Sequence, residues 1–178
     1  LGLSMARCVE IIEERLGRPL PEGFVDRLQA RTFEAFHGGL RPVEGVSRAL
    51  GRIDVPVCVA SSGEHEKMRL TLGLTGLLDR FEGRIFSATE VQRGKPHPDL
   101  FLHAARSLGA HPDRCVVVED SPPGVLAARA AGMAALGYAG GDGGEGLAAA
   151  GARLFHSMAE LPELLTAIAP GGGESCLA

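Results

Sequence analysis

The sequence predicts an α/β protein built on a doubly wound parallel sheet, joined to a small helical unit. Three observations lead to this prediction. From residue 42 onward, short apolar runs alternate with longer amphipathic segments, which is the element order of a parallel sheet. These runs are apolar throughout, as strands covered by helices on both faces are. Before that point the apolar residues recur only at helical spacing, so we divide the chain into a helical cap (1–41), an α/β core (42–169) and a Gly-rich flexible tail (170–178).

Two helices are expected in residues 1–41. The first should begin behind Ser4, a good N-cap residue, and end at Gly17. The second should begin near Phe24 and end at Gly38-Gly39. Because two helices alone cannot bury both of their apolar faces, we expect them to be part of a small bundle.

The core is expected to alternate strands with helices. We expect strands over 55–60, 84–87, 115–118, 134–138 and 153–155, and helices around 46–50 and over 64–74, 98–108, 124–131 and 161–168. Pro56 is compatible with the first strand only near its start, because proline has no N–H to donate. In such sheets ligands bind at the carboxyl ends of the strands, where this sequence places Ser61, Ser62, Glu119 and Asp120.

Charge and cysteine usage exclude several classes of protein. The net charge is −4 and there is no basic tract, which argues against a nucleic-acid partner. No apolar run approaches membrane-spanning length, so we expect no membrane partner. The four cysteines are scattered without a Cys-x-x-Cys pair, which argues against a zinc site and suits the reducing cytosol. We expect a cytoplasmic monomer.

The stretch 94–99, Gly-Lys-Pro-His-Pro-Asp, is the first candidate for chemistry. Two prolines stiffen the loop, so Lys95 is held in one direction. Its ammonium could neutralise a phosphate and a nearby carboxylate together. A solvated surface lysine is the alternative, but the motif is specific enough to favour a functional lysine.

Glu119 and Asp120 follow three valines at the end of a predicted strand. Adjacent carboxylates repel each other unless a cation is near. Mg²⁺ binds one or two carboxylates together with water and phosphate oxygens, so the pair is a candidate Mg²⁺ site. Asp120 or Ser121 could also cap the following helix, with Pro122 in its first turn, and both roles are compatible.

Ser61, Ser62 and Gly63 form the third stretch, between a strand and a helix. The hydroxyl and the following N–H groups could hold an anion at the helix N-terminus. A plain N-cap is the alternative, and this stretch alone would favour it.

The order of these three stretches resembles the haloacid dehalogenase (HAD) superfamily, and more narrowly the β-phosphoglucomutase-like phosphatases. The resemblance covers nearly the whole chain and implies a Rossmann-like core with a small α-helical cap. It implies that Ser61 binds the phosphoryl group with Ser62 and Gly63, and that Lys95 bridges the phosphate and the nucleophile. It further implies Glu119 and Asp120 as residues of the Mg²⁺ site, and a cap loop at Gly2 and Ser4 that contacts the substrate.

The family's first motif, an Asp-x-Asp that carries the nucleophile, has no match, because no two aspartates lie two residues apart. In the family, that motif follows a central strand between the strands expected at 55–60 and 115–118. Because the sequence also begins without Met, we expect an upstream segment that carries this strand.

The resemblance implies a Mg²⁺-dependent phosphatase that acts on a small phosphorylated metabolite, such as a sugar phosphate, through an aspartyl-phosphate. The alternatives are a phosphomutase of the same family and a phosphate-binding module without activity. A serine hydrolase using Ser61 or Ser62 with His65 or His97 lacks the Gly-x-Ser-x-Gly elbow. The Gly-rich stretch 141–146 fits a dinucleotide-binding pattern, but the helix after it is too short, so we interpret it as a flexible loop.

Overall fold

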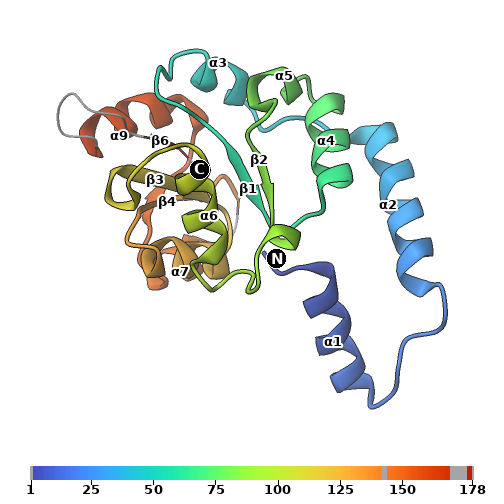
Figure 1. The fold of residues 1–178 in the computed structure, drawn as a ribbon. Coiled ribbons are helices and arrows are strands. Elements are labelled where there is room, and N and C mark those ends of the chain that lie inside the picture. The colour runs from blue at the N-terminus through green and yellow to red at the C-terminus, as the bar shows by residue number, and fades with distance from the viewer. Residues whose placement is uncertain (1, 142–143, 169–175, 178) are drawn as a thin grey trace.

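A computed structural model of the protein describes residues 2–141, 144–168 and 176–177 of the chain. Parallel strands and the helices around them form an α/β core, and two helices extend from it as an arm (Figure 1). None of the described helices is long and apolar enough to cross a membrane.

The strands form two parallel sheets. In the smaller sheet, β1 (Val59–Ser61) pairs with β2 (Ile85–Ser87). In the larger sheet the order is β5 (Arg153–Phe155), β4 (Ala134–Tyr138), β3 (Cys115–Glu119) and β6 (Cys176–Leu177). No strand pairing among the described residues joins the two sheets, and we call the boundary between them the seam.

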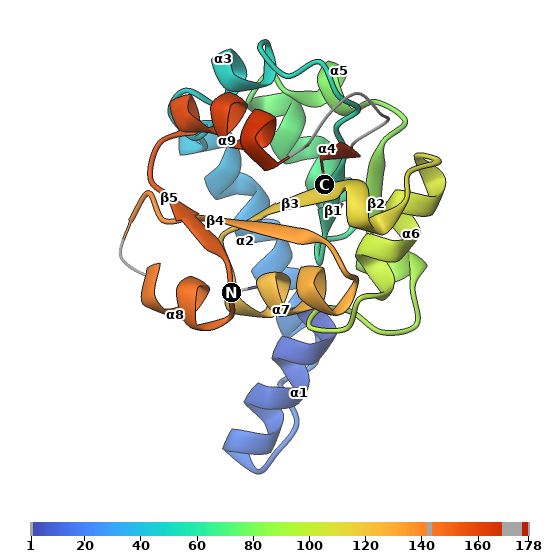
Figure 2. The same ribbon diagram turned by 90° about the vertical axis from the view of Figure 1, so that its left-hand side faces the viewer.

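Helices cover both faces of the strands, so that the core has three layers. On one face lie α3 (Val46–Leu50), α4 (His65–Leu74), α5 (Leu78–Phe81) and α9 (Leu161–Ile168); on the other lie α6 (Asp99–Ser107), α7 (Pro122–Ala130) and α8 (Gly144–Ala149). Figure 2 shows α3 and α9 on one side of β3 and β4, with α7 and α8 on the other. The apolar cluster under α3 and α9 includes residues of β1, β3, β4 and β5, so the seam is closed by packing.

The arm consists of α1 (Met5–Leu16) and α2 (Phe24–Gly39). Neither helix contains a buried residue, and Met5, Ile12, Leu16 and Leu28 are each at least 40% exposed. Ser4 caps α1 by accepting a hydrogen bond from the Arg7 amide, and Gly17 ends it with a positive φ, both as predicted. The arm contacts the core where α2 packs beside α4 (Figure 1).

Most predicted core elements are confirmed, several of them to the residue. The bounds of β4, β5 and α9 are those that the sequence predicts. The first strand is displaced: it was expected at 55–60, whereas β1 covers Val59–Ser61. Pro56 cannot donate to a ladder, and β2 offers partners only opposite these three residues.

Two expectations for Gly-rich segments need correction. The stretch 141–146 was expected to be a flexible loop, but α8 begins at Gly144, because Leu147 is buried against Val125; positions 142–143 lie outside the described residues. In the expected flexible tail, Cys176 and Leu177 instead form β6, since the edge of β3 opposite β4 offers backbone partners. The remaining positions of that tail also lie outside the described residues.

Candidate functional site

The turn after β1 is held by two serines from neighbouring strand ends. The Ser61 hydroxyl accepts a hydrogen bond from the Gly63 amide at 3.1 Å. The Ser87 hydroxyl, at the end of β2, donates to the Gly63 carbonyl at 2.8 Å. Because Ser87 is completely buried, this bond fixes the turn from inside the core.

Ser62 points toward the N-terminal loop. Its hydroxyl donates to the Gly2 carbonyl at 2.8 Å. Gly2 has a φ of 91°, and a Cβ on it would overlap the Ser121 hydroxyl. The loop at Gly2 therefore lies at the strand ends of both sheets, where a substrate-contacting loop is expected. Ser4 of the same loop caps α1, as its position predicts.

Lys95 lies on a loop that an ion pair closes. The Arg93 guanidinium donates two hydrogen bonds to the Asp99 carboxylate, at 2.8 and 3.1 Å, and this contact lowers the pKa of Asp99. The Lys95 side chain is only 6% exposed. Its ammonium donates to the Ala60 carbonyl of β1 at 3.1 Å and forms an ion pair with Glu119 of β3. Lys95 thus crosses the seam.

Both oxygens of the Glu119 carboxylate are engaged. One accepts from Lys95, and the other accepts from the Ser121 hydroxyl at 2.8 Å. Ser121 also caps α7 by accepting a hydrogen bond from the Gly124 amide at 3.3 Å. A Cβ on Gly124 would overlap the Glu119 carboxylate. Glycine at this position is therefore required for the buried ion pair to fit.

Asp120 differs from its neighbour because its side chain is exposed. Among the described residues, no three His, Cys, Asp or Glu side chains are grouped closely enough to hold a metal ion. Mg²⁺ does not need such a group, since one or two carboxylates with water and phosphate oxygens suffice. Asp120 fits that requirement as a direct ligand. Glu119, with both oxygens already accepting hydrogen bonds, fits as a neighbour that supplies negative charge.

The serine-hydrolase alternative finds no support in the geometry. His65 bonds to Glu90 at 2.7 Å, and no described hydrogen bond joins a histidine to Ser61 or Ser62. Burial raises the pKa of the Cys58 thiol to about 12, so this cysteine is a poor nucleophile.

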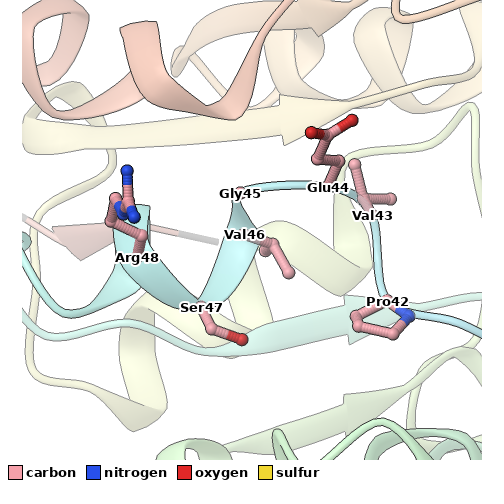
Figure 3. A pocket seen from close by; sticks show the side chains of 7 residues that line it. All are labelled: Pro42, Val43, Glu44, Gly45, Val46, Ser47 and Arg48. Carbon is pink, nitrogen blue, oxygen red and sulfur yellow. The ribbon is translucent and has the colours of Figure 1, made fainter.

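A pocket of about 430 Å³ lies elsewhere, lined by residues 42–48 of the loop before α3 and of the start of that helix. Figure 3 shows Arg48 at one end of the segment that lines it and Pro42 at the other. It contains none of the predicted site residues, and the chemistry-bearing side chains gather instead at the strand ends.

Sequence reasoning missed three features of the site. The buried Ser87 under the turn could have been found, since Ser-x-x-Glu over 87–90 is a capping-box pattern, and the structure contains that box. The bond between Ser62 and Gly2 joins positions 60 residues apart and has no sequence signal. The same holds for the ring of Phe101, which lies against Lys95.

Comparisons with known proteins point to one family. A family profile described as haloacid dehalogenase-like hydrolase matches residues 5–132. The 6-phosphogluconate phosphatase of Escherichia coli (strain K12) is 28% identical over 164 residues, which cover 92% of this chain and 74% of that protein. The fructose-1-phosphate phosphatase YqaB of the same organism is 40% identical over 81 residues, which cover 46% of this chain and 43% of the relative.

Solved structures show the same fold. A haloacid dehalogenase-like protein of Agrobacterium tumefaciens has a TM-score of 0.80 and 32% identity, with 94% of this chain and 79% of that one covered. A HAD family hydrolase of Deinococcus radiodurans R1, solved with bound phosphate and sodium, has a TM-score of 0.71 and 34% identity, with 94% and 77% covered. A β-phosphoglucomutase of Clostridium difficile shares the fold, with a TM-score of 0.77 at 21% identity and 94% and 77% covered.

Proposed function

The chain belongs to the haloacid dehalogenase-like hydrolases, and on that basis we propose that it is a Mg²⁺-dependent phosphatase of a small phosphorylated metabolite. The observation that carries the proposal is the buried pair of Lys95 and Glu119 at the strand ends, beside the Ser61 turn and the exposed Asp120. A buried cation next to a turn with backbone N–H groups is suited to hold a phosphoryl group.

Each residue has a distinct role in this proposal. Ser61 and the N–H groups after it hold phosphoryl oxygens, while Lys95 neutralises their charge. An ammonium has three donors, and two of them are used by the Ala60 carbonyl and Glu119, which leaves one for the phosphoryl group. Asp120, with Glu119 behind it, would hold a Mg²⁺ ion at the same strand ends. The metal supplies positive charge that stabilises the transition state when it is bound.

The covalent step of the proposal needs a nucleophilic aspartate. In the family resemblance, an Asp-x-Asp provides it and forms an aspartyl-phosphate that water then hydrolyses. The 178 residues contain no such motif. The residues assigned above are therefore those that bind and position the phosphoryl group and the metal ion.

The class of substrate follows from the relatives. Those described above are named as phosphatases of 6-phosphogluconate and of fructose 1-phosphate, both of which are small sugar phosphates. In this chain the Gly2 loop lies at the strand ends, so it would contact the part of the substrate beyond the phosphate. A sugar phosphate is the substrate class that we assign.

Two alternatives remain specific enough to test. A phosphomutase would use the same phosphate site, and the fold is shared with a β-phosphoglucomutase. A phosphate-binding module without turnover is the alternative if the natural protein has no Asp-x-Asp segment.

The test is a phosphate-release assay of this chain, and of a version preceded by a segment that carries Asp-x-Asp, with a panel of sugar phosphates. We expect release that requires Mg²⁺ and stops on addition of EDTA. Isomerised sugar phosphate without release would indicate a mutase, and Mg²⁺-dependent binding without turnover in either version would indicate a binding module. If neither version binds phosphate or turns over a sugar phosphate, the whole assignment is contradicted.

A further inference from the structure

Lys95 has a partner that its proposed role does not explain. Its Nζ lies 4.9 Å from the centroid of the ring of Phe101, a residue in the first turn of α6. A cation at this distance from an aromatic face is attracted by the negative charge of the ring face. This attraction is strongest where water is excluded, and here the lysine side chain is 6% exposed and Phe101 is 1% exposed.

We propose that Phe101 is a positioning residue for Lys95, whose ring face holds the ammonium in place for an anion at the strand ends. The ring approaches the ammonium in addition to its two hydrogen-bond acceptors, the Ala60 carbonyl and the Glu119 carboxylate. The flexible four-carbon stem of Lys95 is thereby restrained by an electrostatic contact that requires no hydrogen bond from the ammonium. The remaining N–H donor stays available to an anion.

The ring is itself held firmly. Phe101 packs in an apolar cluster with Cys115 and Val117 of β3 and with Ala127 and Ala128 of α7. It therefore cannot follow the ammonium if the lysine moves. The second contact of this kind in the described chain, Lys67 over Phe36 at 5.8 Å, lies on the surface between α4 and α2 and has no such restraint.

The inference is tested by changing the charge distribution of the ring while its shape is nearly kept. Phenylalanine at position 101 is replaced by its mono-, di- and trifluorinated analogues, which progressively weaken the attraction of the ring face for a cation. Phe81 is the matched control: it is 7% exposed, and in the described chain it has no aromatic or cationic ring contact.

Two quantities are measured on the full chain. The midpoint temperature of unfolding should fall stepwise with fluorination at position 101 and not at position 81. The affinity for inorganic phosphate, measured calorimetrically with Mg²⁺, should fall in the same order at position 101, by roughly tenfold for the trifluorinated ring. In the neutral background Lys95→Met with Glu119→Gln, the stepwise fall in midpoint temperature should disappear.

The inference would be overturned if fluorination at position 101 left the midpoint temperature unchanged, or if fluorination at position 81 lowered it equally. It would also be overturned if the stepwise fall at position 101 persisted in the neutral background. If the neutral background does not fold, the comparison between positions 101 and 81 still decides. The measurement of phosphate affinity rests on the proposed function, whereas the measurement of unfolding temperature does not. A wild-type chain that fails to bind phosphate would therefore count against the proposed function, and the stability series would still decide on Phe101.

Discussion

The Glu119 carboxylate occupies the space in which a side chain at position 124 would begin. Gly124 lies in the first turn of α7, and its amide bonds to Ser121, the residue that also bonds to Glu119. The helix and the buried carboxylate are therefore fitted to each other, and a methyl group would separate them.

Gly124→Ala should destabilise the protein, although alanine is the better helix former by about 1 kcal/mol. Overpacking against a buried carboxylate that cannot leave Lys95 should cost about 1–3 kcal/mol. Urea unfolding measures the change. Gly73→Ala on α4 is the matched control, because a Cβ there meets nothing within 4 Å, and it should be neutral or slightly stabilising. Equal stability of the two variants would contradict the fit described here.

Lys95→Ala should remove phosphate binding and also destabilise the fold. It leaves Glu119 as a buried charge without its cation, which typically costs about 3–5 kcal/mol. Lys95→Arg should not restore phosphate binding, since the wider guanidinium does not fit between the Ala60 carbonyl and Glu119. Phosphate titration and urea unfolding measure the two effects. Full recovery with arginine would indicate that only a diffuse charge is needed.

In a version of the chain preceded by a segment that carries Asp-x-Asp, Asp120→Asn should abolish Mg²⁺-dependent activity while the fold survives. The side chain is exposed, so its loss leaves the core unchanged, but the carboxylate that we propose as the metal ligand is removed. A rate loss of roughly a thousandfold corresponds to about 4 kcal/mol of transition-state stabilisation. Activity and Mg²⁺ binding are measured beside the midpoint temperature of unfolding, which should be unchanged. Near-normal turnover with Mg²⁺ would exclude Asp120 as the metal ligand.

Ser87→Ala should weaken phosphate binding indirectly, because Ser87 is buried beneath the turn that we propose holds the phosphate. The variant leaves the Gly63 carbonyl without its buried donor, which costs about 1–3 kcal/mol, and frees the turn after β1. The exposed Ser107→Ala serves as the control and should change neither stability nor phosphate affinity. If Ser87→Ala lowers only stability, the hydroxyl supports the fold and does not shape the turn.

Stability should fall in acid partly through Glu90. Burial opposes its ionisation, but hydrogen bonds from the Ser87 amide, His103 and His65 outweigh burial and lower the pKa of Glu90. A carboxylate with a lowered folded-state pKa stabilises the protein above its unfolded-state pKa, near 4.3, and this contribution is lost as the pH falls through the folded-state value. Unfolding free energies between pH 7 and pH 3 should therefore fall less steeply in Glu90→Gln than in the wild type. Parallel curves would mean that the hydrogen bonds do not favour the ionised form.

Local patterns predict the elements well where each element buries its own apolar side chains. β4, β5 and α9 lie where the periodicity of the sequence places them. The prediction fails where a partner distant in sequence decides the structure. β1 begins four residues after the predicted start because its hydrogen bonds depend on β2. The helix α8 begins at a glycine because Leu147 packs against α7.

The candidate site divides in the same way. Lys95, Glu119, Asp120 and Ser61 stand at the ends of predicted strands or in a stiff loop, so general rules about parallel sheets find them. Their partners are side chains whose relevance is visible only in three dimensions: Phe101 reads as an ordinary core residue, and nothing in the sequence connects Ser62 with Gly2.

Lys95 bonds to one strand of each sheet. Binding of an anion at Lys95 is therefore coupled to the free energy that holds the two sheets together. An anion that binds only while β1 and β3 are held together raises the free energy needed to part them, by an amount set by its concentration relative to its dissociation constant. The protein would then be most rigid while it holds a ligand, and release of the ligand would coincide with loosening along the seam.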